Sequence, residues 1–504
     1  MKKILLSSIC LETGTDLQLA LYYLKSYFLK YSQKSDPTVK VKIQVFNEDQ
    51  PTDIILEEIL KQKPSFVGFS CYLWNIKKTL RICRLLKKNK PEIKIFLGGP
   101  EVSPRAEEIF LKERAIDVVV RGEGEDTFLE LVDAFRQKDV SLSGIKGISF
   151  RNAKKIIHNP DRPNIAELDI IPSPYLSGLV NLKDKHILDV PLETTRGCVY
   201  HCSYCYYHKN FNCVRTFPLK RIEKELKFIL SQKPGEVYLM DANFNANRKR
   251  AIEILKIFQK YNRGSSLHLE LMAELVDERL AEILGKIGSL NIEIGIQSTN
   301  PKTLKVINRP FNKERFQKGI KLLNKFNLSY EIQLIDALPF QSYDDLKKSL
   351  DWLYDLRPVK LVILKLSMLP GTVLRQMSGC FGIKYSSTAP YYAYKSNAMS
   401  EADVLKVDKL RFAMNRLYDS RVFQETLYAL RDKAGIKIST IMDDWIIWES
   451  KIKRRGHDYV EVLNTKLPEF MRYLLCKHKK SSMYKLFSPG LEAKMLEFKK
   501  MYYR

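Results

Sequence analysis

Strand and helix signals alternate regularly along residues 1–150 and again along residues 190–375, and this pattern constrains the fold more than any other feature of the sequence. Alternation of this kind predicts parallel sheets that are covered by helices. The candidate strands of the first stretch are KILLSSI at 3–9, VKIQVFN at 41–47, FVGFSCY at 66–72, KIFLGG at 94–99 and AIDVVVRG at 115–122. We therefore predict an α/β protein that begins with a doubly wound, Rossmann-like sheet.

The chain has 504 residues, which is more than one hydrophobic core normally supports, so several domains are expected. Residues 1–150 form the first predicted domain, and residues 151–189, rich in Pro, Asn and Asp, form a connector. Residues 190–375 predict a partial (β/α)6 barrel of the TIM type, and residues 376–504 are helical and charged. In both sheets we expect ligands beyond the carboxyl ends of the strands.

Composition narrows the class of protein. No apolar run is long enough to span a membrane, and the opening MKKILLSSIC reads as a buried strand, because Glu12 and Asp16 follow it closely. The nine scattered cysteines indicate a reducing, cytoplasmic location. A net charge of +26 is compatible with an acidic partner such as nucleic acid or a phosphorylated cofactor. However, Lys and Arg are spread along the whole chain, which favours a lysine-rich background, and we do not expect nucleic acid as a partner.

Three cysteines lie in the segment ETTRGCVYHCSYCYYH at 193–208. Cys198, Cys202 and Cys205 have the spacing C-x-x-x-C-x-x-C. Their thiolates could hold three irons of a [4Fe-4S] cluster and leave the fourth iron open to a small molecule, a site that requires low oxygen. The alternative is a zinc ion bound by the three cysteines and His201 or His208. The long strand and helix alternation that follows favours the cluster.

The cysteine motif resembles that of the radical S-adenosylmethionine (SAM) enzymes. The resemblance implies that Tyr204 lies against the adenine of SAM, and that Asp241 and Asn243 hold the methionine amine after the strand EVYLMDANF. It assigns Glu270 to the ribose and Glu293 to the polar end of the ligand. Further contacts with SAM are implied for Gln297, Ser298, Leu369 and Pro370.

A second set of candidate residues follows the predicted strands of the first domain. Glycines there allow the backbone to approach a large planar ligand closely. In their order, these residues resemble the cobalamin-binding domain that precedes the radical domain in one class of these enzymes. The candidate cobalamin contacts are Ser70, Tyr72, Trp74, Gly98, Gly99, Pro100, Glu101, Gly122, Glu123 and Gly124.

One departure concerns the cobalt ligand. The motif D-x-H-x-x-G, which supplies a histidine to cobalt in many cobalamin proteins, is absent, and the chain has Cys10-Leu11-Glu12-Thr13-Gly14 after the first strand. The resemblance therefore implies cobalamin without a protein histidine on the metal. Cys10 is a further candidate, but a small thiol at a strand end is more simply a buried packing residue.

The resemblance implies three cofactors: a [4Fe-4S] cluster, SAM and cobalamin. Cleavage of SAM would give a 5′-deoxyadenosyl radical, and methylcobalamin would give a methyl group to a carbon or phosphorus of the substrate. We favour such a methyltransferase over a radical cyclase or rearrangement enzyme with the same cofactors, and over a non-catalytic cobalamin sensor. Methylthiotransferases are disfavoured because the first domain lacks their cysteine triplet. The substrate, a small molecule, lipid or peptide, is not identified by the sequence, and the implied electron donor is a flavodoxin or ferredoxin.

Two features bear on the substrate cavity. Family members usually have Gly-Leu-Pro-Gly where this chain has Ala337-Leu338-Pro339-Phe340, so Phe340 is expected to change the shape of the cavity. The helical tail carries aromatic residues, including Trp445 and Trp448, that predict either core packing or a lid that excludes water.

Overall fold

The computed structural model describes residues 2–11, 17–32, 39–136, 141–182, 189–211, 213–419, 423–451 and 459–487. The chain forms two compact units. The first unit comprises residues 1–291, 367–378 and 385–392, and the second comprises residues 292–366, 379–384 and 393–504. Among the described residues, no helix combines the length and the apolar character that a membrane span needs.

The first unit begins with a seven-stranded sheet whose order is β2-β1-β3-β4-β5-β6-β7. The first five strands are parallel, and β6 and β7 add an antiparallel hairpin at one edge. The bounds of the strands are β1 Lys2–Cys10, β2 Val39–Asn47, β3 Phe66–Ser70, β4 Lys94–Gly98, β5 Val118–Val120, β6 Ile148–Asn152 and β7 Lys155–His158. The helices are α1 Leu19–Tyr31, α2 Thr52–Lys61, α3 Ile76–Asn89, α4 Ala106–Lys112 and α5 Glu125–Arg136.

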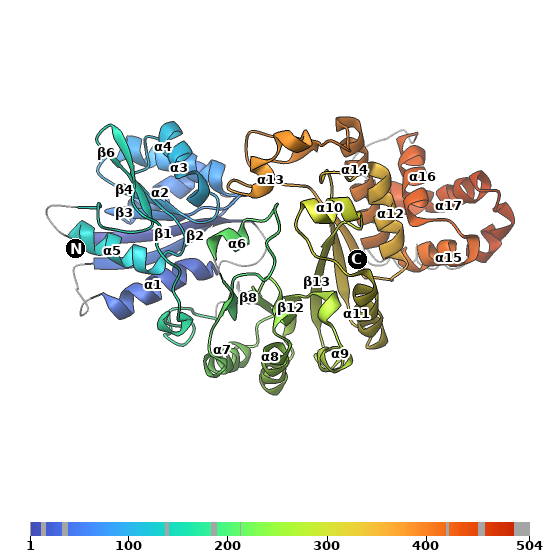
Figure 1. Cartoon of the computed structure of the whole chain (residues 1–504), viewed down its shortest axis with the longest axis horizontal. Coiled ribbons are helices and arrows are strands. Elements are labelled where there is room, and N and C mark those ends of the chain that lie inside the picture. The colour runs from blue at the N-terminus through green and yellow to red at the C-terminus, as the bar shows by residue number, and fades with distance from the viewer. Residues whose placement is uncertain are drawn as a thin grey trace. The chain divides into compact units, whose positions relative to one another are not determined.

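This sheet confirms the doubly wound prediction. Figure 1 shows α1 and α5 on one side of the sheet and α2, α3 and α4 on the other. The five predicted strands match β1 to β5, whereas the hairpin was not predicted, and β7 falls within the residues assigned to the connector. The order β2-β1-β3 places a topological switch point between β1 and β3, where parallel sheets of this type hold their ligands.

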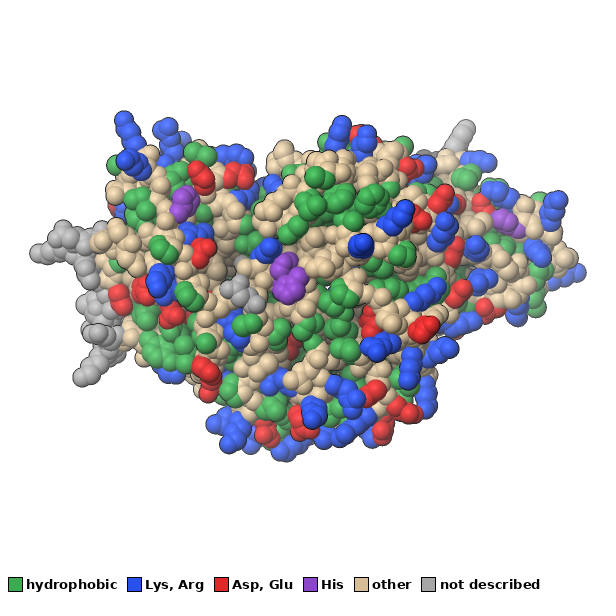
Figure 2. Space-filling view, in the orientation of Figure 1, with side chains coloured by type: hydrophobic (Ala, Val, Ile, Leu, Met, Phe, Trp, Pro, Cys, Tyr) green, Lys and Arg blue, Asp and Glu red, His purple; other side chains and the backbone are tan. Residues whose placement is uncertain are grey.

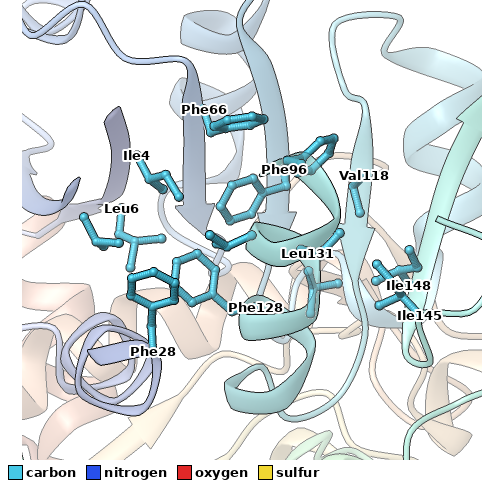
Figure 3. Close-up of a cluster of buried hydrophobic side chains, with 14 of the residues drawn as sticks. Ile4, Leu6, Phe28, Phe66, Phe96, Val118, Phe128, Leu131, Ile145 and Ile148 are labelled. Carbon is cyan, nitrogen blue, oxygen red and sulfur yellow. The ribbon is translucent and has the colours of Figure 1, made fainter. Parts of the chain in front are cut away.

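Aromatic and branched side chains fill the space between this sheet and the helices α1 and α5. Figure 3 shows Phe28 of α1, Phe128 of α5 and Phe96 of β4 in this core. The ring centroid of Phe128 lies 6.0 Å from that of Phe28 and 6.0 Å from that of Phe96. Gly68 of β3 is required here, because a Cβ atom at that position would lie 2.2 Å from the Phe96 ring. This core fixes the sheet and hence the direction of the loops at its carboxyl edge.

The first unit continues with three further parallel strands in the order β12-β11-β8. A short antiparallel pair, β9 and β10, follows β8 and encloses the cysteine segment. The strands are β8 Asp189–Leu192, β9 Thr195–Arg196, β10 Arg215–Thr216, β11 Glu236–Leu239 and β12 Ser266–Glu270, and the helices are α6 Tyr207–Asn210, α7 Leu219–Ser231, α8 Arg248–Tyr261, α9 Glu278–Gly285 and α13 Val373–Gln376.

The second unit contains the parallel strands β14 and β15 and most of β13, in the order β15-β14-β13. Helices account for most of the remaining described residues of this unit. The strands are β13 Leu290–Gln297, β14 Tyr330–Ile335 and β15 Lys360–Leu364, and the short strands β16 Lys384–Tyr385 and β17 Ala393–Lys395 come later in the chain. The helices are α10 Pro301–Val306, α11 Lys313–Lys325, α12 Tyr343–Tyr354, α14 Glu401–Met414, α15 Gln424–Ala434, α16 Ile438–Ser450 and α17 Tyr459–Lys477.

Local sequence explains where several of these helices begin. Ser342 and Asp345 form a capping box at the start of α12, and Ser400 and Asp403 form another at the start of α14. Asn247, Asn300 and Asn312 cap α8, α10 and α11 through their side-chain oxygens, which satisfy backbone N–H groups that a helix leaves free.

The tail aromatics pack inside the second unit. Trp445 of α16 is fully buried and meets Phe470 of α17 edge-on, with ring centroids 4.9 Å apart. Trp448 lies 5.2 Å from Trp445 between ring centroids. This contact supports the core-packing interpretation of these two residues. The basic run at Lys451–Arg455 lies outside the described residues from position 452 onward.

Candidate functional site

The three cysteines of the segment between β9 and β10 converge. Cys202 is buried, Cys198 and Cys205 are half-buried, and none of the three forms a disulfide bond. Burial raises the pKa of the Cys205 thiol to about 11, and the neighbouring sulfurs of Cys202 and Cys198 contribute to the increase. The charges of the other two sulfur atoms thus reach Cys205, as is expected where three cysteines share one short loop.

The sulfur atoms of Cys198 and Cys205 accept hydrogen bonds from the surrounding chain. The backbone N–H of Tyr200 lies 3.4 Å from Cys198 Sγ, and that of Tyr207 lies 3.4 Å from Cys205 Sγ. The side-chain amide of Asn243 donates to Cys198 Sγ at 3.0 Å. Hydrogen bonds to cysteine sulfur are a usual feature of iron–sulfur sites, where they tune the reduction potential. The loop therefore fits a [4Fe-4S] cluster.

Asn243 and Glu270 reach this loop from the ends of β11 and β12. Asn243 was predicted to bind the methionine amine, but in this structure its amide is directed at Cys198. The Glu270 carboxylate lies close enough for its charge to contribute to the raised pKa of Cys205. Within the described ranges, no three His, Cys, Asp or Glu side chains come close enough to share a single metal ion.

Asp241 has partners that the sequence did not predict. Its Oδ1 accepts the backbone N–H groups of Thr194 at 2.8 Å and Thr195 at 2.9 Å, and its Oδ2 accepts the Thr194 hydroxyl. Asp241 is buried, and burial raises its pKa while these hydrogen bonds oppose the increase. Most of its acceptor capacity is thus used to hold the strand end before the cluster loop, and contact with the methionine amine remains a prediction.

Gly197 is the residue immediately before the first cysteine. Its φ is +106°, in the region that favours glycine, and a Cβ atom there would lie 2.4 Å from the backbone oxygen of Cys213. The close approach of the two chain segments around the cluster loop therefore depends on this glycine.

Leu369 and Pro370, which are predicted to contact SAM, lie in a loop of the first unit that packs on the cluster loop. The backbone N–H of Leu374 donates to Ser203 O at 2.8 Å. A Cβ atom on Gly371 would lie 2.6 Å from the ring of Tyr206, so this approach is close. Tyr204 is half-buried in the same region, and its stacking on adenine stays a prediction.

In the second unit, Gln297 ends β13 in an unusual conformation. Its φ is +70°, and the pairing of β13 with β14 shifts register between Gly295 and Gln297. The side chain is 8% exposed, and its Oε1 has no hydrogen-bond partner among the described residues. A strained residue with an unsatisfied buried acceptor is expected at ligand sites, so the observation supports the predicted role of Gln297 toward SAM.

The two other predicted residues of β13 and its loop have partners in the second unit. Ser298 is fully buried and its hydroxyl oxygen accepts the backbone N–H of Asn300 at 3.1 Å. Glu293 accepts a hydrogen bond from the Gln333 amide at 2.8 Å. Their contacts with SAM stay predictions.

The carboxyl edge of the seven-stranded sheet carries the predicted cobalamin residues. Tyr72 and Trp74 stack with ring centroids 4.6 Å apart and planes 3° apart, and Trp74 is 44% exposed. Gly99 has a φ of +105°, and a Cβ atom there would lie 2.6 Å from Cys71 O. Gly122, with a φ of +76°, has no atom within 4 Å of its Cβ position. Open space at a glycine on the ligand edge fits the close approach of a large planar group.

Asn75, which the sequence analysis missed, holds this edge together. It is fully buried, and its amide donates to Ile9 O and Ser70 O, both at 3.1 Å. Its side-chain oxygen accepts the backbone N–H of Tyr72 at 2.8 Å. Asn75 thereby links the ends of β1 and β3 at the switch point. The only sequence signal was an Asn shortly after a strand, which is common in ordinary turns.

Two predicted cobalamin residues are engaged elsewhere. The Glu101 carboxylate pairs with Arg105 and accepts the Tyr391 hydroxyl at 2.6 Å. The Glu123 carboxylate binds Arg196 and Arg215. Burial alone would raise the pKa of Glu123, but its hydrogen bonds with the two arginines lower the pKa overall. Both carboxylates are thus committed to buried ion pairs, and contact of Glu101 and Glu123 with cobalamin stays a prediction.

Two family models match the regions just described. The B12 binding domain model matches residues 35–132, and the Radical SAM superfamily model matches residues 192–353, which include the three cysteines. The chain is a radical SAM enzyme with a cobalamin-binding domain. The zinc alternative is thereby rejected, and the cofactors are a [4Fe-4S] cluster, SAM and cobalamin. The residue limits of the four predicted parts remain a prediction.

Curated relatives place this radical SAM enzyme near methyltransferases and a cyclase. An uncharacterised methyltransferase of Pyrococcus horikoshii is 29% identical over 64% of this chain and 71% of its own length. The cobalamin-dependent radical SAM methyltransferase TokK of Streptomyces tokunonensis is 29% identical over 36% of this chain and 28% of its own. The anaerobic magnesium-protoporphyrin IX monomethyl ester cyclase of Rubrivivax gelatinosus is 25% identical over 66% of this chain and 62% of its own. The chain thus spans less than two thirds of the second and third relatives.

Solved structures confirm the fold. The cobalamin-dependent SAM radical enzyme OxsB superimposes with a TM-score of 0.67 at 17% identity, over 99% of this chain and 83% of the other. The radical SAM methyltransferase TsrM from Kitasatospora setae gives a TM-score of 0.63 at 15% identity, over 78% and 80%. The predicted combination of a Rossmann-like domain, a partial barrel and a helical C-terminal region is confirmed.

Proposed function

We propose that this radical SAM enzyme transfers a methyl group from SAM to an unactivated carbon, or to phosphorus, of a substrate that is a small molecule, lipid or peptide. The observation that carries the proposal is an ion pair that joins the two cofactor regions of the first unit. Glu123, in the loop after β5, lies 2.8 Å from Arg196, two residues before Cys198. A loop of the B12 binding domain therefore lies beside the cluster loop, as a reaction that uses both cofactors needs.

In this proposal, the residues of the chain bind the cofactors and orient them. When bound, the cluster and SAM supply a radical that removes hydrogen from carbon, and cobalamin supplies the methyl group. Cys198, Cys202 and Cys205 would hold the cluster, and Asn243 would donate to the first of these sulfurs. Gln297 offers a buried acceptor for SAM. The proposal requires no protein nucleophile, because positioning is the chain's contribution.

The second candidate is a cyclase or rearrangement enzyme with the same cofactors, and the relative from Rubrivivax gelatinosus favours it. Both candidates need an electron donor, for which we propose an acidic flavodoxin or ferredoxin. Charge favours such a partner, because the chain carries a net +26. Figure 2 shows Lys and Arg side chains distributed over the visible face and interspersed with Asp and Glu.

Product analysis distinguishes the candidates. The chain is reconstituted without oxygen with iron, sulfide and cobalamin, and is given a reductant, methyl-labelled SAM and a panel of candidate substrates. Methyl transfer predicts labelled product with S-adenosylhomocysteine and 5′-deoxyadenosine in about equal amounts, because each turnover consumes one SAM for the methyl and one for the radical. An unlabelled, rearranged product with 5′-deoxyadenosine alone would favour the cyclase, and neither nucleoside would favour a sensor.

Replacing Cys198, Cys202 or Cys205 by Ala should abolish 5′-deoxyadenosine formation and lower bound iron. Cys213→Ala is the matched control, because Cys213 is an exposed thiol of the same region. Full activity in a variant that lacks all three cysteines, or equal loss in the control, would end the radical interpretation.

A further inference from the structure

A buried ion-pair network joins the loop after β5 to the two strands that enclose the cluster loop. Glu123 Oε1 lies 2.8 Å from Arg196 Nη1 and 3.0 Å from Arg215 Nη2, and Glu123 Oε2 lies 2.9 Å from Arg215 Nη1. The same Oε2 accepts the backbone N–H of Ile165 at 2.7 Å. A carboxylate has about four acceptor positions, so Glu123 has none left for a further ligand.

Each of the three nitrogen atoms of the Arg196 guanidinium binds a carboxylate. Its Nη1 binds Glu123, its Nη2 binds Glu125 at 2.8 Å, and its Nε binds Glu193 at 3.0 Å. The side chains of Arg196, Glu123 and Glu125 are each no more than 6% exposed. A planar guanidinium held on three edges has one orientation, and its backbone is constrained with it.

The position of the two arginines links the network to the cysteines. Arg196 of β9 and Arg215 of β10 are directly paired across this short antiparallel ribbon. Arg196 precedes Cys198 by two residues, and Arg215 follows Cys213 by two. One carboxylate of the B12 binding domain thus holds both strands from which the cluster loop emerges.

We propose that Glu123 and Glu125 are positioning residues for the cluster, acting through Arg196 and Arg215 to hold the cysteine loop in the geometry that binds iron. The role differs from cobalamin binding, which the sequence suggested for Glu123. It applies equally to methyl transfer and to cyclisation, because both need the cluster. Buried charges are costly unless they are paired with good geometry. We therefore expect the network to fix the position of the cysteine loop rather than to raise the free energy of unfolding.

The test measures cluster binding and cobalamin binding separately. Glu123→Gln and Glu125→Gln are compared with the parent and with Glu130→Gln, a control that alters the more exposed ion pair of Glu130 with Arg162. Each full-length chain is reconstituted without oxygen, and three quantities are measured: iron release to a chelator, the electron paramagnetic resonance spectrum of the reduced cluster with and without SAM, and cobalamin uptake from absorbance. Melting temperatures of the chains without cofactors show whether each variant folds.

In both variants we expect iron release to become about tenfold faster, since residues that orient metal ligands typically alter metal affinity by that order. The spectrum of the reduced cluster should change as well, while cobalamin uptake stays within about twofold of the parent. Cobalamin loss with a normal cluster would overturn the proposal, as would a normal cluster and normal uptake in both variants. If Glu123→Gln does not fold, Glu125→Gln decides, because it removes only the charge of the carboxylate that binds Arg196 Nη2: loss of both cofactors in that variant would also overturn the proposal.

Discussion

Asp241→Ala should open the strand end that leads into the cluster loop. The substitution removes three hydrogen bonds and leaves the N–H groups of Thr194 and Thr195 without their acceptor. A buried polar group that loses its partner costs about 1–3 kcal/mol. The two amides together should therefore lower the free energy of local opening by about 2–6 kcal/mol, if little water reaches them.

Hydrogen–deuterium exchange measures this effect directly, because amide exchange reports local opening. Since about 1.4 kcal/mol corresponds to a tenfold change, amides of the segment around Thr194 should exchange at least about 25-fold faster in Asp241→Ala. Peptides from the seven-stranded sheet serve as the internal control and should keep their rates.

Asp241→Asn is the matched variant. Its Oδ1 can still accept both backbone N–H groups, and its amide can donate to the Thr194 hydroxyl, so exchange should stay close to that of the parent. Equal exchange in the Ala variant and the parent, or equally fast exchange in the Asn and Ala variants, would refute the reasoning. Weaker SAM binding in the Asn variant with intact protection would instead reveal the methionine contact that the sequence predicted.

Three further changes test other parts of the chain. Gly197→Ala should lower the melting temperature and weaken iron retention, because an alanine in the left-handed region costs about 1–2 kcal/mol and its Cβ would lie 2.4 Å from a backbone oxygen. Gly264→Ala is the control: its φ of +112° is also positive, but no atom lies near its Cβ position, so it should lack the clash. Burial raises the pKa of Asp419 from 3.8 to about 7, so the folded chain holds this proton more tightly, and the stability it contributes is lost as pH rises toward about 7. In Asp419→Asn the free energy of unfolding should not show this pH-dependent loss, which amounts to up to about 4 kcal/mol in the parent. Melting temperatures of variant and parent that change in parallel between pH 4 and 8 would contradict this expectation. Tyr391→Phe should lower the melting temperature, because the phenol donates to the buried Glu101 carboxylate and a hydrogen bond to a charged group contributes about 1.5–3 kcal/mol; an unchanged melting temperature would contradict this.

Periodicity predicted the parallel strands well because they are buried and short. FVGFSCY and KIFLGG appear almost unchanged as β3 and β4, since continuous apolar runs bounded by polar turns have few other structures. The hairpin of β6 and β7 was missed because β7 is half-exposed and lies among turn-forming residues. Edge strands of that kind carry little apolar signal.

The direction of side chains at the strand ends was harder to predict. Glu101 and Glu123 are expected at the ligand edge from their positions after β4 and β5, but their partners Tyr391 and Arg196 are 290 and 73 residues away along the chain. Nothing local in the sequence specifies such pairs. Likewise, the run NIEIGIQS predicts a strand but not the register shift that leaves Gln297 with an unsatisfied oxygen.

The network around Arg196 limits how this enzyme could be recombined. The two family matches end at residue 132 and begin again at residue 192, as if the chain were two exchangeable modules. Yet Glu123 and Glu125 belong to one match, and Arg196 and Arg215 to the other. A chimera that takes its front module from a relative without both carboxylates would bury Arg215 without its carboxylate partner and would leave Arg196 paired with Glu193 alone. These modules are therefore expected to be inherited together, and a successful graft would have to carry the four charged residues as one set.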